Sequence, residues 1–161
     1  MVTWWRRLPA SHLPPISEEV HVSRVEAQQM EAWAHTVVAG FREDTAPIAD
    51  SEVEPWEVRN FCARATAPNC YPFLAVRVAQ LAGGAILQMK GEAALLRTAS
   101  TRFLHRSRGV QTALIAARLT CASEAGCKVA FSIANAANPS ERNLRRFGFT
   151  FLQEGRIFIK P

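Results

Sequence analysis

The sequence predicts an α+β fold in three layers, with a mixed, mostly antiparallel central sheet and helices on both faces. Strand-like and helix-like segments alternate in the order β-α-α-β-β-β-α-β-α-β. Consecutive strands joined by short turns pair as antiparallel hairpins, whereas the later strands are separated by helices and need crossovers. The 161 residues, of which 48% are hydrophobic, suffice for one domain with its own core.

The first part of the predicted domain contains one strand and two helices. Val20–Val25 alternates apolar and polar side chains, as a half-buried strand does. In Glu26–Phe41 the apolar residues recur at helical spacing, which predicts a helix. A capping-box pattern that begins at Ser51 predicts a second helix over Val53–Ala65, with Trp56 turned inward.

Three strands follow. The segments Phe73–Val78 and Gly84–Met89 flank a glycine-containing turn at Gln80–Gly83, so we expect them to form a hairpin. A further turn at Lys90–Glu92 leads into a third strand, Ala93–Thr101.

The last part of the chain alternates helices and strands. Val110–Ala125 reads as a helix of about four turns, and Gly126 stands where a helix would end. Lys128–Ala134 reads as a buried strand, and Ser140–Phe147 as a short helix. Phe149–Lys160 closes the chain as one or two strands.

Composition excludes several classes of protein. No window holds the about 18 consecutive apolar residues that a membrane helix needs, and Arg6-Arg7 is not followed by the apolar run of a signal peptide. We therefore expect a cytoplasmic protein. The four cysteines form no CxxC pair and the four histidines are scattered, so we expect reduced thiols and no metal site.

A basic loop before the longest predicted helix is the most informative stretch. The run from His105 to Leu114 opens with three basic residues among its first four, His105, Arg106 and Arg108. Gly109 follows, just before the predicted helix. The first N–H groups of a helix lack internal partners and carry the positive end of its dipole, roughly +0.5 charge. The net charge of +5 also suits an anionic partner. This stretch predicts a phosphate-binding loop.

The same stretch resembles the GNAT acyltransferase superfamily. That family's acetyl-CoA motif is Gln/Arg-x-x-Gly-x-Gly/Ala, and the chain has Arg106-x-x-Gly109-x-Gln111 between a strand and a helix. The downstream run from Asn143 to Phe149, which ends in Gly148-Phe149, fits the same family. The resemblance implies a GNAT-like sheet that is splayed where acetyl-CoA binds, with residues 18–161 as the acyltransferase domain.

The resemblance also implies acetyl-CoA as acyl donor and a small-molecule or peptide amine as acceptor. Ala99, Ser100 and Thr101 would pair with the pantetheine arm, and amides from Arg108 to Thr112 would hold the pyrophosphate. Ser140 and Asn143 would lie by the pantetheine or adenosine. The implied cofactor-binding residues are Ala99, Ser100, Thr101, Arg106, Ser107, Arg108, Gly109, Val110, Gln111, Thr112, Ser140, Asn143 and Arg146.

The implied chemistry is direct attack of a neutral amine on the thioester, with a backbone N–H of the splayed strand as oxyanion donor. Two positions depart from the family pattern. Gln111 stands where the motif has Gly or Ala, and Leu144 where the family often has a tyrosine acid. Glu92 is the candidate general base, although a solvated turn carboxylate is the plainer interpretation and water is an alternative acceptor.

An acidic segment provides an independent hypothesis. Six acids and no Lys or Arg lie between Glu43 and Val58. They would draw a cationic amine toward the cleft, or they are simply a solvated helix face. The acids considered are Glu43, Asp44, Asp50, Glu52, Glu54 and Glu57.

Two other functions stay open on the sequence. A non-catalytic acyl-CoA-binding module would keep the phosphate loop and lack the acid, and a nucleic-acid binder is suggested only by the basic pI near 9.5. Residues 1–17, with Trp4-Trp5-Arg6-Arg7 before a proline-bearing segment, read as an extended arm outside the core. Its two adjacent tryptophans need a surface to pack on, which is either the domain itself or a second copy of the chain, and the arm would otherwise join a neighbouring domain.

Overall fold

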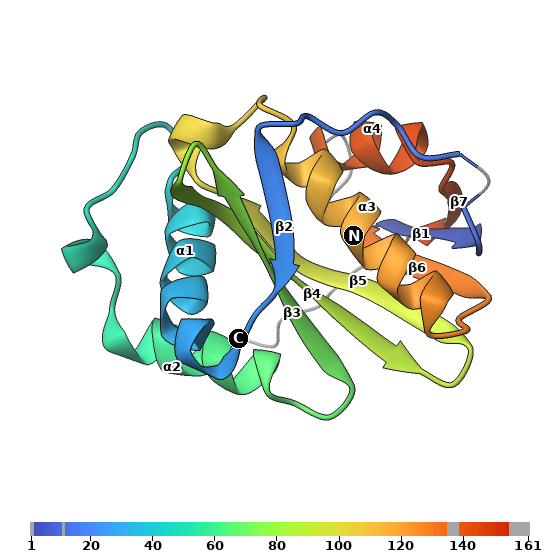
Figure 1. The fold of residues 1–161 in the computed structure, drawn as a ribbon, viewed down its shortest axis with the longest axis horizontal. Helices are drawn as coiled ribbons and strands as arrows, with labels where there is room; N and C mark the ends of the chain where they lie inside the picture. Colours follow the sequence, from blue (N-terminus) through green and yellow to red (C-terminus); the bar gives the residue numbers. More distant parts are fainter. Residues whose placement is uncertain (1, 11, 135–138, 155–161) are drawn as a thin grey trace.

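A computed structural model of the protein describes residues 2–10, 12–134 and 139–154. Its strands form one seven-stranded sheet in the order β2-β3-β4-β5-β6-β1-β7 (Figure 1). The strands are β1 Val2–Arg7, β2 Val20–Arg24, β3 Cys70–Arg77, β4 Gln80–Lys90, β5 Ala93–Thr101, β6 Val129–Ala134 and β7 Thr150–Glu154. The helices are α1 Met30–Arg42, α2 Pro55–Ala65, α3 Val110–Glu124 and α4 Pro139–Arg146.

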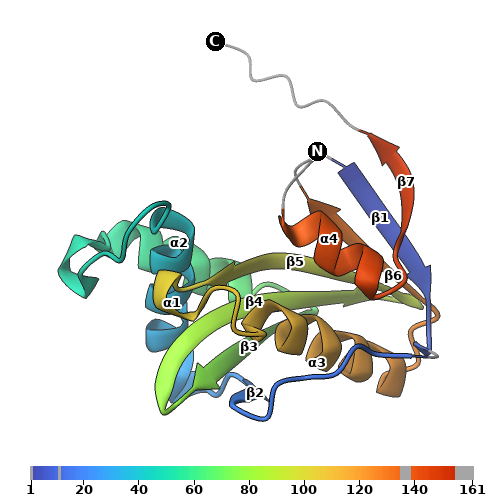
Figure 2. The ribbon, with the colours of Figure 1, turned by 90° about the horizontal axis from the view of Figure 1, so that it is seen from above.

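The predicted three-layer α+β arrangement is confirmed. Helices α1 and α2 lie on one face of the β2–β5 part of the sheet, and α3 lies on the other face (Figure 2). Trp33 and Val37 of α1 pack on Ile86 of β4 in one core, while Leu114 of α3 packs with Leu87 of β4 in the other. Alternate residues of β4 therefore serve opposite cores, as the two-residue period of a strand requires. None of the described helices is long and apolar enough to span a bilayer.

The β3–β4 hairpin is longer than the sequence suggests, and the turn predicted at Gln80–Gly83 is wrong. The turn is made by Val78 and Ala79, both with positive φ (49° and 58°), as in a two-residue hairpin loop. Gly83 and Gly84 lie inside β4 instead. A Cβ on Gly84 would stand 2.6 Å from Trp33 Nε1, so the glycine allows α1 to approach the sheet.

The second helix begins later than predicted, and its tryptophan does not face inward. Glu54 occupies the N-cap and Pro55 the first helical position, where a missing N–H costs nothing. Trp56 is 59% exposed. The inward face of α2 is formed by Val58 and Ala65.

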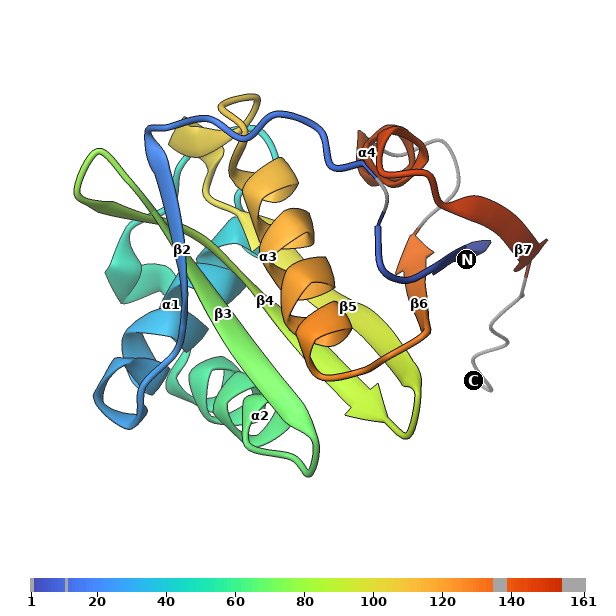
Figure 3. The ribbon, with the colours of Figure 1, turned by 45° about the vertical axis from the view of Figure 1, so that its right-hand side comes forward.

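The prediction that the first residues lie outside the core is wrong for residues 2–7. Strand β1 pairs antiparallel with both β6 and β7, so it is an inner strand of the sheet (Figure 3). Trp4 is only 1% exposed, and Val2 is buried beside it in the core. The extended arm is limited to the connection between β1 and β2, which has no regular helix or strand among its described residues.

The sheet opens between β5 and β6, as predicted. Their parallel pairing ends at Leu96 and Ser132, while β5 continues to Thr101. Ser132 Oγ donates to Leu96 O at 3.2 Å, which satisfies a carbonyl at the point of separation. Strand β7 confirms part of the predicted last strand, and the remainder of that segment falls outside the described residues.

Candidate acetyl-CoA cleft

A cleft of about 1080 Å³ opens where β5 and β6 part. Its walls come from the end of β5, the loop before α3, the last turn of α1 and the helix α4. Because only the first four residues of β5 pair with β6, the far end of β5 has no strand partner along that edge among the described residues. The topology therefore creates a site to which an extended ligand can pair.

The loop before α3 has the backbone shape that the sequence predicts for anion binding. Ser107 (φ 58°) and Gly109 (φ 83°) both adopt left-handed conformations, and Gly109 is the N-cap of α3. Alternation of this kind turns successive N–H groups toward one side and forms an anion-binding concavity. The first intrahelical acceptor is Gly109 O, which receives Ala113 N–H at 3.0 Å, so the N–H groups of residues 110–112 have no partner within the helix.

Every residue that the resemblance implied for cofactor binding lines this one cleft. The structure brings together Ala99, Ser100, Thr101, Arg106, Ser107, Arg108, Gly109, Val110, Gln111, Thr112, Ser140, Asn143 and Arg146. Their contact with acetyl-CoA stays a prediction. Gln111, the first departure from the motif, reaches toward Ser140 Oγ at 3.4 Å and so bridges α3 and α4.

Ser100 and Arg106 are already engaged with α1. Ser100 Oγ donates to Val37 O at 2.8 Å. The Arg106 guanidinium donates to Asp44 O at 3.0 Å, to Gly40 O at 3.2 Å and to Glu43 O. These are carbonyls at and just beyond the C-terminal end of α1, where a cation is favourable. Arg106 thus joins α1 to the phosphate loop, and its predicted contact with phosphate would have to share these donors.

The charge of the cleft favours an anionic ligand. Five arginines line it against two carboxylates, Glu19 and Asp44. Arg108, Arg142 and Arg146 are exposed, whereas Arg77 is tied to Glu19 by an ion pair at 2.7 Å. The connection between β1 and β2 closes one side, because Ser17 lies against Gly109, where an added Cβ would approach Ser17 Cβ to 3.2 Å.

Neither the candidate base Glu92 nor the position of the family's tyrosine acid, Leu144, places a proton-transferring group in the cleft. Leu144, which stands where the family often has tyrosine, is 3% exposed and belongs to the core. Glu92 lies in the turn before β5, exposed and paired with Lys128. At about 3.4 Å per strand residue, Glu92 is roughly 24 Å from Ala99 at the cleft. The structure therefore does not bring the candidate base to the candidate site.

Glu43 has a structural task that the sequence did not reveal. Its carboxylate is 1% exposed and accepts from Arg102 Nε at 2.8 Å and from the Phe103 amide. Glu57 similarly accepts from the Glu54 amide and pairs with Arg42 at 3.2 Å. Of the acids between Glu43 and Val58, only Asp44 lines the cleft of about 1080 Å³. The hypothesis that this segment draws a cationic amine into the cleft therefore depends on Asp44 alone.

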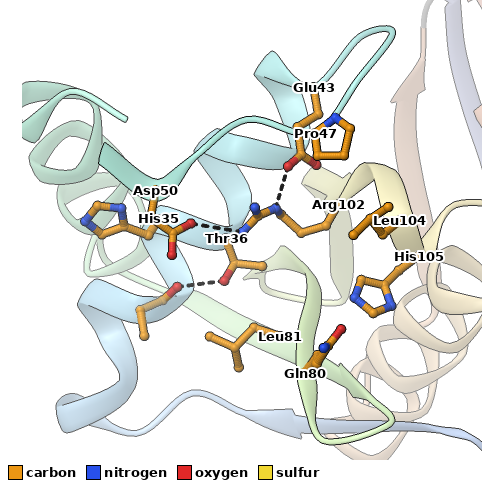
Figure 4. Close-up of a pocket in the computed structure, with 11 residues that line it drawn as sticks. His35, Thr36, Glu43, Pro47, Asp50, Gln80, Leu81, Arg102, Leu104 and His105 are labelled. Atoms are coloured by element: carbon orange, nitrogen blue, oxygen red, sulfur yellow. Dashed lines mark hydrogen bonds and ion pairs between the residues drawn. The ribbon is translucent and has the colours of Figure 1, made fainter. Parts of the chain in front are cut away.

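A second cavity of about 510 Å³ lies beyond the loop, between α1, the β3–β4 turn and residues 102–105. Arg102 spans it between Glu43 and Asp50 (Figure 4). His105 lines both cavities, is 6% exposed and has an Nδ1 atom with no hydrogen-bond partner. Burial, followed by the charges of Arg77 and Arg102, lowers the pKa of His105 below its usual 6.5, which keeps the imidazole neutral.

Several residues that line the cleft of about 1080 Å³ could not be predicted from the sequence. Gly40, Phe41 and Arg77 belong to elements that read as ordinary helix and strand, and no local signal marked them. Arg142 could have been found, since it lies between two predicted ligands on α4. Within the described ranges, no three His, Cys, Asp or Glu side chains gather as a metal site would require.

No protein-family model matches the chain, and no curated protein resembles it in sequence. Solved structures do resemble it in fold. A GCN5-related N-acetyltransferase from Kribbella flavida superposes with a TM-score of 0.65 at 16% identity, over 93% of this chain and 53% of that one. The tandem GNAT protein from the clavulanic acid biosynthesis pathway gives 0.63 at 17% identity, over 92% of this chain and 49% of that one.

A third structure matches over nearly its whole length. AAC(6')-Iy, solved with the bisubstrate analogue CoA-S-monomethyl-acetylneamine, gives a TM-score of 0.65 at 16% identity, over 88% of this chain and 98% of that one. The chain thus spans about half the length of the first two proteins and nearly all of the third. By its strand order, its splayed sheet and these superpositions, the chain has the fold of the GCN5-related N-acetyltransferases.

Proposed function

We propose that this chain is an acyl-CoA-dependent N-acyltransferase that moves an acetyl group from acetyl-CoA to a primary amine. One observation carries the proposal: a single cleft joins the free edge of β5 to the amides of a basic loop and the start of α3. Its volume of about 1080 Å³ suits a long ligand. The excess of arginines suits a ligand with several phosphates.

The donor would lie along the cleft in one direction. Residues 99–101 pair with the amide groups of pantetheine, as a further strand would. Amides from Arg108 to Thr112 hold the pyrophosphate, with Arg108 beside it. Ser140 and Asn143 lie by the pantetheine or adenosine, and Arg146 adds charge for a phosphate. No metal is needed for any of these contacts.

The reaction would depend on orientation and electrostatics more than on protein acids and bases. The neutral amine attacks the thioester carbon, and its nitrogen then loses a proton to water. A backbone N–H of β5 stabilises the oxyanion. Because Leu144 cannot donate a proton, the thiolate leaves unprotonated or takes its proton from water.

The fold neighbours support this assignment at the level of acyl transfer. One of them was solved in complex with a bisubstrate analogue, CoA-S-monomethyl-acetylneamine, which supports a cleft that takes donor and acceptor together. The acceptor of this chain would approach from the side of α1, where Phe41 and Asp44 line the cleft. Asp44 would favour a cationic amine.

The alternative is a non-catalytic acyl-CoA-binding module. The buried Leu144 and the remote Glu92 favour it, because the described cleft then needs no proton-transfer group. This alternative predicts binding of acetyl-CoA without turnover for every amine.

The decisive experiment combines binding and turnover. Acetyl-CoA at a hundredfold excess over its Kd should stabilise the protein by about 2.7 kcal/mol, measured as a shift of the thermal midpoint. Release of free thiol from acetyl-CoA is then followed with a panel of primary amines. If millimolar acetyl-CoA does not stabilise the protein, both the acyltransferase and the binding module are contradicted. Stabilisation without thiol release would favour the binding module.

A further inference from the structure

Arg118, in the middle of α3, is buried without a carboxylate partner. Its side chain is 2% exposed, and in the described part of the chain it forms no ion pair. Burial lowers the pKa of Arg118 to about 9, so the group remains a cation at neutral pH. An unpaired buried cation is costly unless neighbouring polar groups compensate its charge.

The guanidinium contacts three backbone carbonyls. Nε donates to Leu114 O, one turn earlier in α3, at 2.9 Å. Nη1 crosses to the sheet and donates to Ile86 O at 3.3 Å and to Arg97 O at 3.4 Å. The charge of Arg118 is therefore placed against β4 and β5 at one particular level of the sheet.

That level is an irregularity in the sheet. Ala85 pairs with Ala99 and Ile86 pairs with Arg97, so Thr98 is an extra residue on β5. Thr98 has a φ of 47°, a left-handed conformation that a β-branched residue adopts only under strain. Arg118 thus satisfies the carbonyls of the paired residues Ile86 and Arg97, beside the bulged residue, where regular pairing is interrupted.

The bulge also lies next to the cleft. The cleft-lining part of β5 begins at Ala99, immediately after Thr98, and the pairing of β5 with β6 has already ended at Leu96. The carbonyl of Arg97 and the N–H of Thr98 belong to the same trans peptide group, so they point in opposite directions. Since Arg118 draws the carbonyl toward α3, the Thr98 N–H points away from α3, toward the face of the sheet on which α1 packs. Gly40 and Phe41, near the end of α1, line the cleft beside Ala99.

We propose that Arg118 is a positioning residue that fixes the Arg97–Thr98 peptide group and presents the Thr98 N–H as the oxyanion donor. This inference rests on the acyltransferase function proposed above. The amine nitrogen forms a bond to the thioester carbon, and the carbonyl π electrons move to its oxygen, which accepts the Thr98 N–H. When the carbonyl re-forms, the C–S bond breaks and CoA leaves as a thiolate, while the ammonium proton passes to water.

The cation contributes in two ways. A positive charge at the Arg97 oxygen polarises the peptide group and makes the Thr98 N–H a stronger donor. The field of an unpaired cation in a region of low dielectric also favours the negative charge that develops on the oxyanion and the thiolate. This second effect suits a site in which Leu144 offers no proton to the leaving group.

The kinetic test uses Arg118→Met, which keeps an unbranched apolar stem and removes the charge, and Arg118→Lys, which keeps a charge with fewer donors. Removing a single oxyanion donor commonly costs on the order of 100-fold or more in kcat, so we expect Arg118→Met to lower kcat by about 10- to 100-fold. The KM for acetyl-CoA should change less than about threefold, because the pyrophosphate contacts are untouched. Arg118→Lys should recover part of kcat.

Arg24→Met is the matched control, since Arg24 lies on β2, stacks on Tyr71 and does not line the cleft. Wild-type kcat in a folded Arg118→Met variant would overturn the proposal. So would equal losses in kcat for Arg24→Met.

A second measurement does not depend on turnover. In the free protein, NMR should show that Arg118→Met moves the Arg97 carbonyl-carbon and Thr98 amide resonances, whereas those of Ala94, in the regular part of β5, stay in place. Unmoved Thr98 and Arg97 resonances would refute the positioning role itself. Shifted resonances in a protein that binds acetyl-CoA but acetylates no amine would instead refute the proposed function and, with it, the oxyanion role. If Arg118→Met does not fold, Arg118→Lys carries both measurements.

Discussion

The two halves of the sheet are assembled from different parts of the chain. Strands β2, β3, β4 and β5 are neighbours in the sheet in the same order as in the chain. Only short turns separate β3, β4 and β5 in the sequence, whereas α1 and α2 lie between β2 and β3. The other half, β6-β1-β7, combines strands from both ends of the chain. The halves are joined by the short parallel pairing of residues 93–96 with 129–132. The cleft opens at this junction, so its geometry depends on how firmly each half is held.

The largest expected effect concerns the half made from distant segments. Trp4→Ala removes a side chain that is 1% exposed at the centre of β1, and large aromatic truncations in a core cost about 3–5 kcal/mol. Trp5→Ala, at the half-buried neighbouring position, is the matched control and should cost less than half as much. Urea unfolding measures both. Equal losses for the two variants would show that β1 does not hold this half together.

In the half made from consecutive strands, added side-chain volume at the contact between α1 and β4 should lower the free energy of unfolding. Gly84→Ala places a methyl group 2.6 Å from Trp33 Nε1, whose N–H donates to Phe73 O at 2.9 Å. Overpacking of this kind typically costs about 1–3 kcal/mol. Gly91→Asn is the control, because Gly91 lies in open space and asparagine tolerates its φ of 57°. If denaturant unfolding shows the same free energy of unfolding for Gly84→Ala as for the wild type, α1 can shift away from the sheet.

Binding at the junction should depend on the exposed arginine of the loop. Arg108→Ala should weaken acetyl-CoA binding about tenfold, since a charge-assisted contact is worth about 1.5–3 kcal/mol and solvent exposure reduces this. The loss should shrink as salt is added. Arg59→Ala, an exposed arginine of α2 away from the cleft, is the control for calorimetric titration. Equal affinities for Arg108→Ala and wild type would remove Arg108 from the phosphate site.

The smallest effect concerns His105, which lines both cavities. Burial lowers the pKa of His105 from 6.5, and the cations of Arg77 and Arg102 act in the same direction. Below pH 6.5 the unfolded chain binds a proton at this site that the folded chain resists, so stability should fall as the pH decreases from about 6.5 toward the folded pKa.

His105→Gln should reduce this loss of stability on acidification, measured as unfolding free energies between pH 7.5 and 5. The exposed His21→Gln on β2 is the matched control. A change in the pH dependence for His21→Gln as large as that for His105→Gln would contradict the assignment to His105.

The sequence by itself determined the elements with short-range signals. Apolar periodicity indicated α1 and α3, and the basic residues before Gly109 marked the loop that begins α3. Turn signals indicated both hairpins of β3, β4 and β5 but misplaced the first turn, which Val78 and Ala79 make. These features depend on neighbours within one or two turns of chain, so their cause is visible locally. The residues that the family resemblance implies for acetyl-CoA binding line one cleft, and those from Arg106 to Thr112 lie on this loop and the first turn of α3.

Only the tertiary structure decided which distant segments meet. The place of β1 between β6 and β7, the ion pair of Glu43 with Arg102 and the contact of Arg118 with Arg97 O all join segments far apart in the chain. A strand carries no local mark of its partner, since backbone hydrogen bonds are the same for every residue. The same holds for a buried charge, whose role depends on which carbonyls and carboxylates the complete fold places around it.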